Sequence, residues 1–129
     1  MSEQKKILIV DDEEDMHLIM AEILGKSGYK IFSARNGAEG LDVARKTMPD
    51  LIILDIMMPA IDGFKVQEIL REDPKLCKIP VVFVTARTAL EDTIQAITHG
   101  AAGYIEKPFD VKHITRKIES ILGTGGKSS

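Results

Sequence analysis

Three acidic residues follow two short apolar runs, where their carboxylates could bind a metal ion. Asp11 and Asp12 come directly after ILIV at 7–10, and Asp55 comes directly after LIIL at 51–54. If these runs form neighbouring parallel strands, the three carboxylates meet at the carboxyl edge of the sheet and repel one another. A hard divalent cation removes that repulsion, and Mg²⁺ prefers oxygen ligands from one or two carboxylates together with a phosphate. The arrangement therefore predicts a magnesium site.

Two further strand ends carry a hydroxyl and an ammonium group. Thr85 lies at the strand end within VVFVTA at 81–86, and Lys107 lies at the strand end within GYIEKPF at 103–109. A bound phosphoryl group suits this pair, since Lys107 would neutralise its charge and Thr85 would orient it. Taken singly, Thr85 is also a common strand residue and Lys107 a common solvated cation. Their place at the same expected sheet edge as three carboxylates favours phosphoryl chemistry.

The acidic run continues through Glu13, Glu14 and Asp15. Acidic side chains in the first turn of a helix offset the helix dipole, and Asp or Glu can cap its free N–H groups. For these three residues we expect helix capping rather than metal binding. Asp11 and Asp12, directly against the strand, are the expected ligands.

Short apolar runs alternate along the chain with segments of helical period. The expected strands lie at 7–10, 31–32, 51–54, 81–84 and 104–105. The helical stripes contain Met16, Ile19, Met20, Ile23 and Leu24; Ala38, Leu41, Ala44 and Met48; Val66, Ile69 and Leu70; Ile94 and Ile97; and Val111, Ile114, Ile118, Ile121 and Leu122. Runs that are apolar throughout are typical of parallel strands covered on both faces. Five strand–helix units therefore predict an α/β domain, with a parallel sheet between two helical layers.

Composition limits the partners and the compartment. Among 129 residues, the chain has 17 Lys and Arg and 20 Asp and Glu, for a net charge of −3. No broad basic field therefore indicates direct nucleic-acid binding or an anionic membrane. Cys77 is the single cysteine, which excludes an internal disulfide, and the N-terminal apolar stretch is too short for a signal peptide or a membrane span. We expect a cytoplasmic protein without membrane insertion.

Four motifs give the sequence a family resemblance. They are VDDE at 10–13, LDIMMPAIDG at 54–63, VTA at 84–86 and GYIEKPF at 103–109, in this order and each at the end of its own strand. Together they resemble the receiver domains of response regulators, the CheY-like family. The resemblance implies a receiver domain over residues 5–122, a flexible tail over 123–129, and a doubly wound, flavodoxin-like sheet of strand order 2-1-3-4-5.

The resemblance also implies a role for each acidic residue. Asp55 is expected to be the phosphoacceptor, which attacks phosphorus in the phosphohistidine of a sensor histidine kinase or phosphotransfer protein. Asp11 and Asp12 would hold Mg²⁺ together with Asp55, and the main-chain carbonyl of Met57 would be a further ligand. Such a domain is a signalling switch that promotes its own phosphorylation and slow dephosphorylation, rather than a turnover enzyme.

The switch is expected to start from Thr85 and Lys107, which would contact the phosphoryl group. Ala86 and Pro108 would flank it, and the bond before Pro108 is cis in this family. Tyr104 falls at the family's aromatic switch position. Phosphorylation would then change the face formed by the fourth helix, fifth strand and fifth helix, and so alter binding of a downstream protein or formation of a homodimer. No output segment follows residue 122, so output would come from a surface of this domain unless the chain is part of a longer protein.

Two alternatives remain open on the same architecture. An aspartyl-phosphate phosphatase of the haloacid dehalogenase type also uses an Asp after a parallel strand. That class has a second acid two residues after this Asp, whereas in this chain Met57 is the residue two positions after Asp55. A nucleotide- or flavin-binding module would need a glycine-rich phosphate loop, and neither G-x-G-x-x-G nor G-x-x-x-x-G-K-[ST] occurs.

Two side chains near the expected phosphoryl group bear on its lifetime. In this family the residues two beyond the phosphoacceptor and two beyond the switch threonine, here Met57 and Arg87, flank the path of the attacking water. If they cover it, the phosphoryl group is long-lived; if both point into solvent, the rate is set elsewhere. Three histidines, His17, His99 and His113, have no spacing that would assemble a metal site, and we assign them no function.

Overall fold

The computed structural model describes residues 4–86 and 100–123. Its elements are β1 (Lys6–Val10), α1 (Glu14–Lys26), β2 (Lys30–Ala34), α2 (Gly37–Thr47), β3 (Leu51–Leu54), α3 (Gly63–Glu72), β4 (Val81–Thr85), β5 (Gly103–Glu106) and α5 (Val111–Leu122). The five strands form one parallel sheet of order β2-β1-β3-β4-β5. The predicted strand order and fold class are therefore confirmed.

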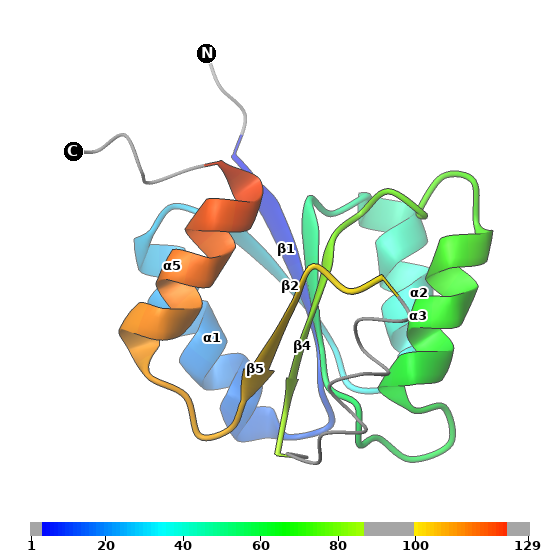
Figure 1. The fold of residues 1–129 in the computed structure, drawn as a ribbon, viewed down its shortest axis with the longest axis horizontal. Coiled ribbons are helices and arrows are strands. Elements are labelled where there is room, and N and C mark those ends of the chain that lie inside the picture. The colour runs from blue at the N-terminus through cyan, green and yellow to red at the C-terminus, as the bar shows by residue number, and fades with distance from the viewer. Residues whose placement is uncertain (1–3, 87–99, 124–129) are drawn as a thin grey trace.

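The helices cover both faces of the sheet. In Figure 1, α1 and α5 lie together on one side of the strands, and α2 and α3 lie together on the other. Each side encloses its own apolar cluster. The expected fourth helix, marked by Ile94 and Ile97, lies outside the described residues. Within the described part of the chain, no helix is long and apolar enough to cross a bilayer.

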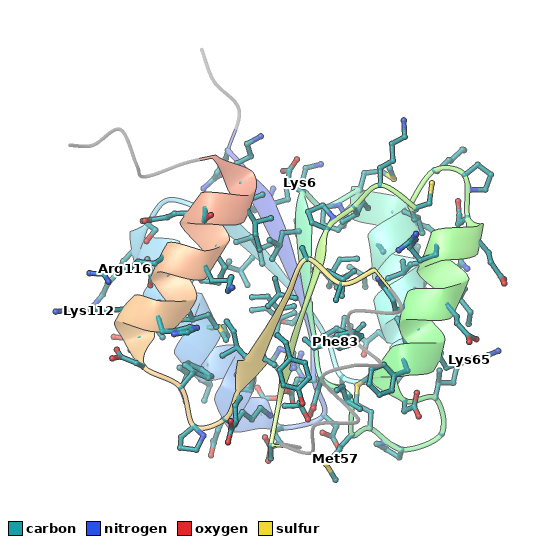
Figure 2. All side chains as sticks on the ribbon, viewed as in Figure 1. Lys6, Met57, Lys65, Phe83, Lys112 and Arg116 are labelled. Carbon is teal, nitrogen blue, oxygen red and sulfur yellow. The ribbon has the colours of Figure 1, made fainter. Side chains whose placement is uncertain are left out.

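Alternation along the strands explains the two clusters. Successive side chains of a strand point to opposite faces, so one strand supplies both clusters. In β1, Leu8 contributes to the cluster under α2 and α3, whereas Ile7 and Ile9 contribute to the cluster under α1 and α5. Phe83, at the centre of Figure 2, is fully buried on β4 and packs edge-on against Phe64 of α3, with ring centroids 5.2 Å apart.

Some residues of the predicted helical stripes are exposed. Ile19, Met48 and Val111 belong to those stripes, but the structure leaves all three side chains in contact with solvent. Met48 follows the last turn of α2 and adopts a left-handed conformation, so it no longer continues the buried stripe. Ile19 and Val111 lie beside each other on one groove. The helical period predicts these helices correctly but makes their buried stripe too wide.

Three helices begin at a side-chain cap that follows a strand or loop at the carboxyl edge. Asn36, Asp62 and Asp110 each accept a hydrogen bond from a main-chain N–H in the first turn of α2, α3 and α5. Such caps satisfy N–H groups that would otherwise have no partner, and they fix where each loop ends. The loop after Asp55, which leads to α3, and the loop after Lys107, which leads to α5, therefore end at a capped helix.

Candidate functional site

Three carboxylates meet at the carboxyl edge of the sheet, as the sequence predicted. Strands β1 and β3 are neighbours, with Val10 opposite Leu54, so the residues that follow them lie side by side. The main-chain N–H of Asp55 donates to the carbonyl of Val10 at 3.0 Å, which continues the ladder by one step. Asp11, Asp12 and Asp55 place one carboxylate oxygen each within 4.8 Å of one another.

The three carboxylates differ in exposure. Asp11 and Asp55 are 2% and 5% exposed, whereas Asp12 is open to solvent. Two buried anions beside an exposed one form a site that can be reached from outside but is shielded underneath. Carboxylates in such surroundings attract a cation strongly, because burial weakens the screening of their charge.

The loop from β3 to α3 approaches Asp55 closely. The main-chain N–H of Met57 donates to Asp55 Oδ1 at 3.2 Å, and the N–H of Gly63 donates to the carbonyl of Ile56 at 2.9 Å. A Cβ atom on Gly63 would collide with the main-chain carbonyl of Asp55, so the first residue of α3 must be glycine. The glycine thus lets the helix begin directly against the candidate phosphoacceptor.

Lys107 supplies the positive charge of the site. Its Nζ lies 3.0 Å from Asp11 Oδ2, 2.9 Å from Glu13 Oε1 and 3.6 Å from Asp55 Oδ2, and its side chain is mostly buried. Its main-chain N–H donates to the carbonyl of Thr85 at 2.9 Å, which ties the end of β5 to the end of β4. The peptide bond from Lys107 to Pro108 is cis, as the family resemblance implied.

The crowding of charge perturbs the acid at the centre. Burial raises the pKa of Asp55, and the negative charge of Asp11 raises it further. The charge of Lys107 and hydrogen bonds from Met57 and Thr85 lower the pKa of Asp55, but they do not cancel the increase. The positive charge and hydrogen bonds around the Asp55 carboxylate therefore do not compensate for its burial and for the nearby negative charge. A bound cation would supply the missing positive charge.

The surroundings disfavour the charged form of Asp55, but they favour the charged forms of Lys107 and Glu13. Burial alone would lower the pKa of Lys107, but hydrogen bonds to Glu13 and Asp11 and the charge of Asp55 outweigh burial, so that pKa is raised. The hydrogen bond to Lys107 lowers the pKa of Glu13. Both groups therefore remain charged at neutral pH.

The residues present fit a hard divalent cation. Three carboxylates with oxygen atoms in reach of one point, of which two are buried, match the ligands that Mg²⁺ prefers. One ammonium group cannot neutralise three carboxylates and the nearby Glu13. Asp11, Asp12 and Asp55 are thus the residues that would hold the ion.

The other predicted site residues lie around this cluster. Thr85 is fully buried at the end of β4 and makes a side-chain hydrogen bond to Asp55. Tyr104 lies on β5 opposite Phe83 and packs in part against the cluster under α2 and α3. Ala86 and Pro108 line a groove beside Lys107.

Of the two residues expected to flank the path of the attacking water, Met57 lies within the described part of the chain and Arg87 does not. Met57 is 54% exposed, and Figure 2 shows its side chain pointing away from the body of the molecule. Arg87 lies outside the described residues. The effect of either residue on phosphoryl lifetime stays a prediction.

One residue at the site was misjudged from the sequence, and the contact of a second was not foreseen. Glu13 precedes α1, but its side chain makes no capping hydrogen bond and instead contacts Lys107, so the expected capping role is wrong. His17 is buried and its Nε2 lies 2.7 Å from the main-chain oxygen of Asp11. The contact of Glu13 depends on how β5 is placed beside the end of β1, and the contact of His17 depends on how α1 is placed against the residue that follows β1.

Comparison with known families and structures agrees with this geometry. Residues 7–119 match the family model described as the response regulator receiver domain. A putative response regulator from Chloroflexus aurantiacus superposes with a TM-score of 0.89 at 29% identity, over 94% of this chain and 99% of that one. The chemotaxis protein CheY4 of Vibrio cholerae superposes with a TM-score of 0.88 at 28% identity, over 93% and 100% of the two chains.

Sequence relatives include both short and long proteins. The polar-differentiation response regulator DivK of Brucella anthropi is 38% identical over 92% of this chain and 97% of its own length. The DNA-binding dual master transcriptional regulator RpaA of Synechocystis is 38% identical over 91% of this chain but only 48% of its own length. The chain thus spans about half the length of the transcriptional regulators that it matches.

Proposed function

The chain belongs to the response regulator receiver domain family, and we propose that within two-component signalling Asp55 accepts the phosphoryl group. The observation that carries this proposal is the meeting of Asp11, Asp12 and Asp55 within 4.8 Å, with Lys107 3.6 Å from Asp55. Family membership favours a receiver over the phosphatase and the nucleotide-binding module that the sequence left open.

The proposed reaction is a transfer between two side chains. An oxygen of the Asp55 carboxylate attacks phosphorus in a phosphohistidine of a histidine kinase or phosphotransfer protein. The new O–P bond forms as the N–P bond breaks, and the electron pair of that bond returns to the imidazole of the donor. The product is an acyl phosphate on Asp55, and the domain turns over only through slow hydrolysis of that bond.

This chain's own residues would orient and stabilise the transferred group. Lys107 already lies beside Asp55 and can form an ion pair with the transferred phosphoryl group. The buried hydroxyl of Thr85 can donate a hydrogen bond to a phosphoryl oxygen. Mg²⁺, when held by the three carboxylates, would neutralise charge on the attacking and equatorial oxygens. Before transfer, Asp55 must be ionised to act as the nucleophile, and because burial and the charge of Asp11 raise its pKa, a bound cation would favour the ionised form.

The donor would dock beside Lys107. A groove of about 580 Å³ opens there between the start of α1 and the start of α5, and it is lined by Glu13, Asp15, Met16, Ile19, Ala86, Lys107, Pro108, Phe109 and Val111. Ile19 and Val111 are large apolar side chains left exposed at this groove. An apolar surface next to the phosphoacceptor suits a protein donor that brings its histidine to Asp55.

Output would use the face that includes β5 and α5. Tyr104 lies on β5 and lines a second hollow with Phe109 and His113, while Thr85 lies on the neighbouring strand β4. Movement of Thr85 toward a phosphoryl group would change the space next to Tyr104. Phosphorylation shifts such a two-state equilibrium only by the difference in free energy that it makes between the states, so a partial change in population is expected.

Hydrolysis of phospho-Asp55 is proposed to be slow. Methionine gives the attacking water no useful hydrogen bond, so Met57→Asn should accelerate release of phosphate. Phosphate release from purified phosphoprotein measures this. Equal rates in the two proteins would mean that the exposed Met57 side chain does not influence the water.

Phosphorylation by a small acyl phosphate tests the proposed function. With Mg²⁺, intact-mass analysis should show the addition of one phosphoryl group, and peptide mapping should place it on Asp55. With a chelator present, the modified fraction should fall sharply. A phosphoryl group on another residue, or full modification without a divalent cation, would contradict the proposal.

A further inference from the structure

His17 is a buried polar side chain next to the site for which phosphotransfer itself provides no role. It lies in α1 and is 4% exposed. Its Nε2 lies 2.7 Å from the main-chain oxygen of Asp11. Its Nδ1 is also buried, and within the described parts of the chain it has no hydrogen-bond partner.

The hydrogen bond defines the form of the ring. A carbonyl oxygen only accepts hydrogen bonds, so Nε2 carries the proton and donates to Asp11. In a neutral imidazole the other nitrogen, Nδ1, is then a bare acceptor. The hydrogen bond to Asp11 thus requires a proton on the nitrogen that faces the site.

An apolar side chain at position 17 would cost less folding free energy than a histidine. A buried acceptor without a partner costs folding free energy, and a Leu or Met would avoid that cost. The other buried side chains of α1 are indeed apolar: Met16, Met20 and Leu24. The hydrogen bond to Asp11 is the contact that none of these apolar side chains could make.

That hydrogen bond completes the fixation of Asp11. The main-chain N–H of Asp11 donates to the carbonyl of Ala34 at 3.1 Å, and Asp11 Oδ1 accepts from the main-chain N–H of Glu13 at 2.8 Å. Asp11 Oδ2 accepts from Lys107, and His17 holds the main-chain carbonyl. A peptide unit is planar, so a fixed carbonyl of Asp11 also fixes the main-chain nitrogen of Asp12. It thereby sets the direction in which the main chain enters Asp12.

We propose that His17 is a positioning residue of the magnesium site. Its Nε2–H holds the peptide between Asp11 and Asp12 so that both carboxylates converge with Asp55. It acts through that peptide and does not bind the ion. The role rests on the proposed function, since it presupposes that these carboxylates bind Mg²⁺.

Two amide substitutions separate positioning from packing. In His17→Gln the side-chain NH₂ can occupy the place of Nε2 and donate to Asp11, whereas in His17→Asn it reaches only the place of Nδ1. Both variants put a similar polar amide in the same buried position. His17→Leu removes the donor and the unpartnered acceptor together.

Mg²⁺ affinity, measured by calorimetric titration of the whole chain, is the readout for these variants. We expect the Gln variant to stay within about threefold of the wild type, and the Asn and Leu variants to bind at least about tenfold more weakly, as when other partners that orient metal ligands are lost. Thermal unfolding without metal shows which variants are folded. A Leu variant that is as stable as the wild type but binds Mg²⁺ weakly would separate positioning from stability.

A measurement on the wild type needs no variant. Long-range ¹H–¹⁵N spectra report which ring nitrogen carries the proton, and His17 should show the Nε2–H tautomer with and without Mg²⁺. A ring that carries its only proton on Nδ1 would overturn the proposal, as would equal Mg²⁺ affinity of folded wild-type, Gln, Asn and Leu proteins. A wild-type chain that binds no Mg²⁺ would overturn the proposed metal site and this role with it, whereas normal wild-type binding with unaffected variants would overturn the role of His17 alone.

Discussion

Asp50 precedes strand β3 and Asp55 follows it, but the surroundings of their carboxylates are opposite in kind. At the amino end, Asp50 Oδ2 accepts the main-chain N–H of Lys6 at 2.8 Å, and the N–H of Asp50 donates back to the carbonyl of Lys6. The side chain of Lys6 donates to the carbonyl of Thr47 at 2.7 Å. At this end the Asp50 carboxylate and the Lys6 ammonium each have a partner within the protein.

At the carboxyl end the partners are insufficient. Asp55 meets Asp11 and Asp12, and Lys107 is the ammonium group that this part of the described chain provides for all three carboxylates. The same strand therefore carries a structural acid at one end and the proposed phosphoacceptor at the other. The comparison indicates that an aspartate is available for chemistry when its surroundings leave its negative charge without enough partners.

The largest expected effect concerns phosphorylation. Asp55→Asn should abolish modification by a small acyl phosphate, because an amide cannot form the acyl phosphate. Asp50→Asn, the matched change at the other end of β3, should be phosphorylated as the wild type is. Intact-mass spectra of the three proteins measure this. A phosphorylated Asp55→Asn protein, or an unmodified folded Asp50→Asn protein, would break the comparison.

Mg²⁺ binding should distinguish the lysines at the two ends. Lys107→Ala should strengthen Mg²⁺ binding about three- to tenfold, because the ammonium competes for Asp11 Oδ2 and repels the ion. Lys6→Ala should leave the affinity unchanged. Asp12→Ala should weaken binding by at least about tenfold, since it removes a proposed ligand. Calorimetric titration of the unphosphorylated proteins gives the affinities, and equal affinities for both lysine variants would refute the proposed competition.

The same substitution should change stability in opposite directions at the two ends of β3. Without metal at pH 7, Asp55→Asn should raise the free energy of unfolding by about 1 kcal/mol, because it removes a buried charge short of partners. Asp50→Asn should lower it by about 1 kcal/mol, since an amide accepts the N–H of Lys6 less strongly than a carboxylate. Urea unfolding of both variants measures the two changes, and equal signs would contradict the comparison.

The pH dependence of the Asp55 effect has a defined sign. The pKa of Asp55 lies above its usual value of 3.8 in the folded chain, so the folded chain binds more protons than the unfolded chain between the two values. Stability contributed by this group therefore falls as pH rises through that window, and the advantage of Asp55→Asn should shrink as pH is lowered toward 3.8. Urea unfolding from neutral to acidic pH, with the wild type as reference, tests this.

The smallest expected effects come from backbone strain on either side of β3. Met48 and Ala60 adopt positive φ angles of 49° and 68°, which cost little only for glycine. Met48→Gly and Ala60→Gly should each raise the free energy of unfolding by up to about 1 kcal/mol. Thermal unfolding checks both. A loss of stability in either variant would mean that packing of the original side chain outweighs the relief of strain.

The sequence by itself determined the fold and the place of the site. Continuous apolar runs predicted the buried parallel strands, and residues that end such strands must share one edge of the sheet. That reasoning brought Asp11, Asp12, Asp55, Thr85 and Lys107 together, and the structure places them at one edge. Local patterns placed these residues at one edge because the direction of parallel strands is a property of the backbone, whereas the strand order that makes β1 and β3 neighbours came from the family resemblance.

Only the tertiary structure decided what each side chain contacts. The ion pair of Lys107 with Asp11 joins residues 96 positions apart, and the contact of Lys107 with Glu13 replaced the capping role expected from local sequence. The hydrogen bond of His17 and the difference between Asp50 and Asp55 likewise depend on neighbouring elements. Sequence patterns report the periodicity of one element, whereas burial and charge compensation arise from the packing of several elements around a point.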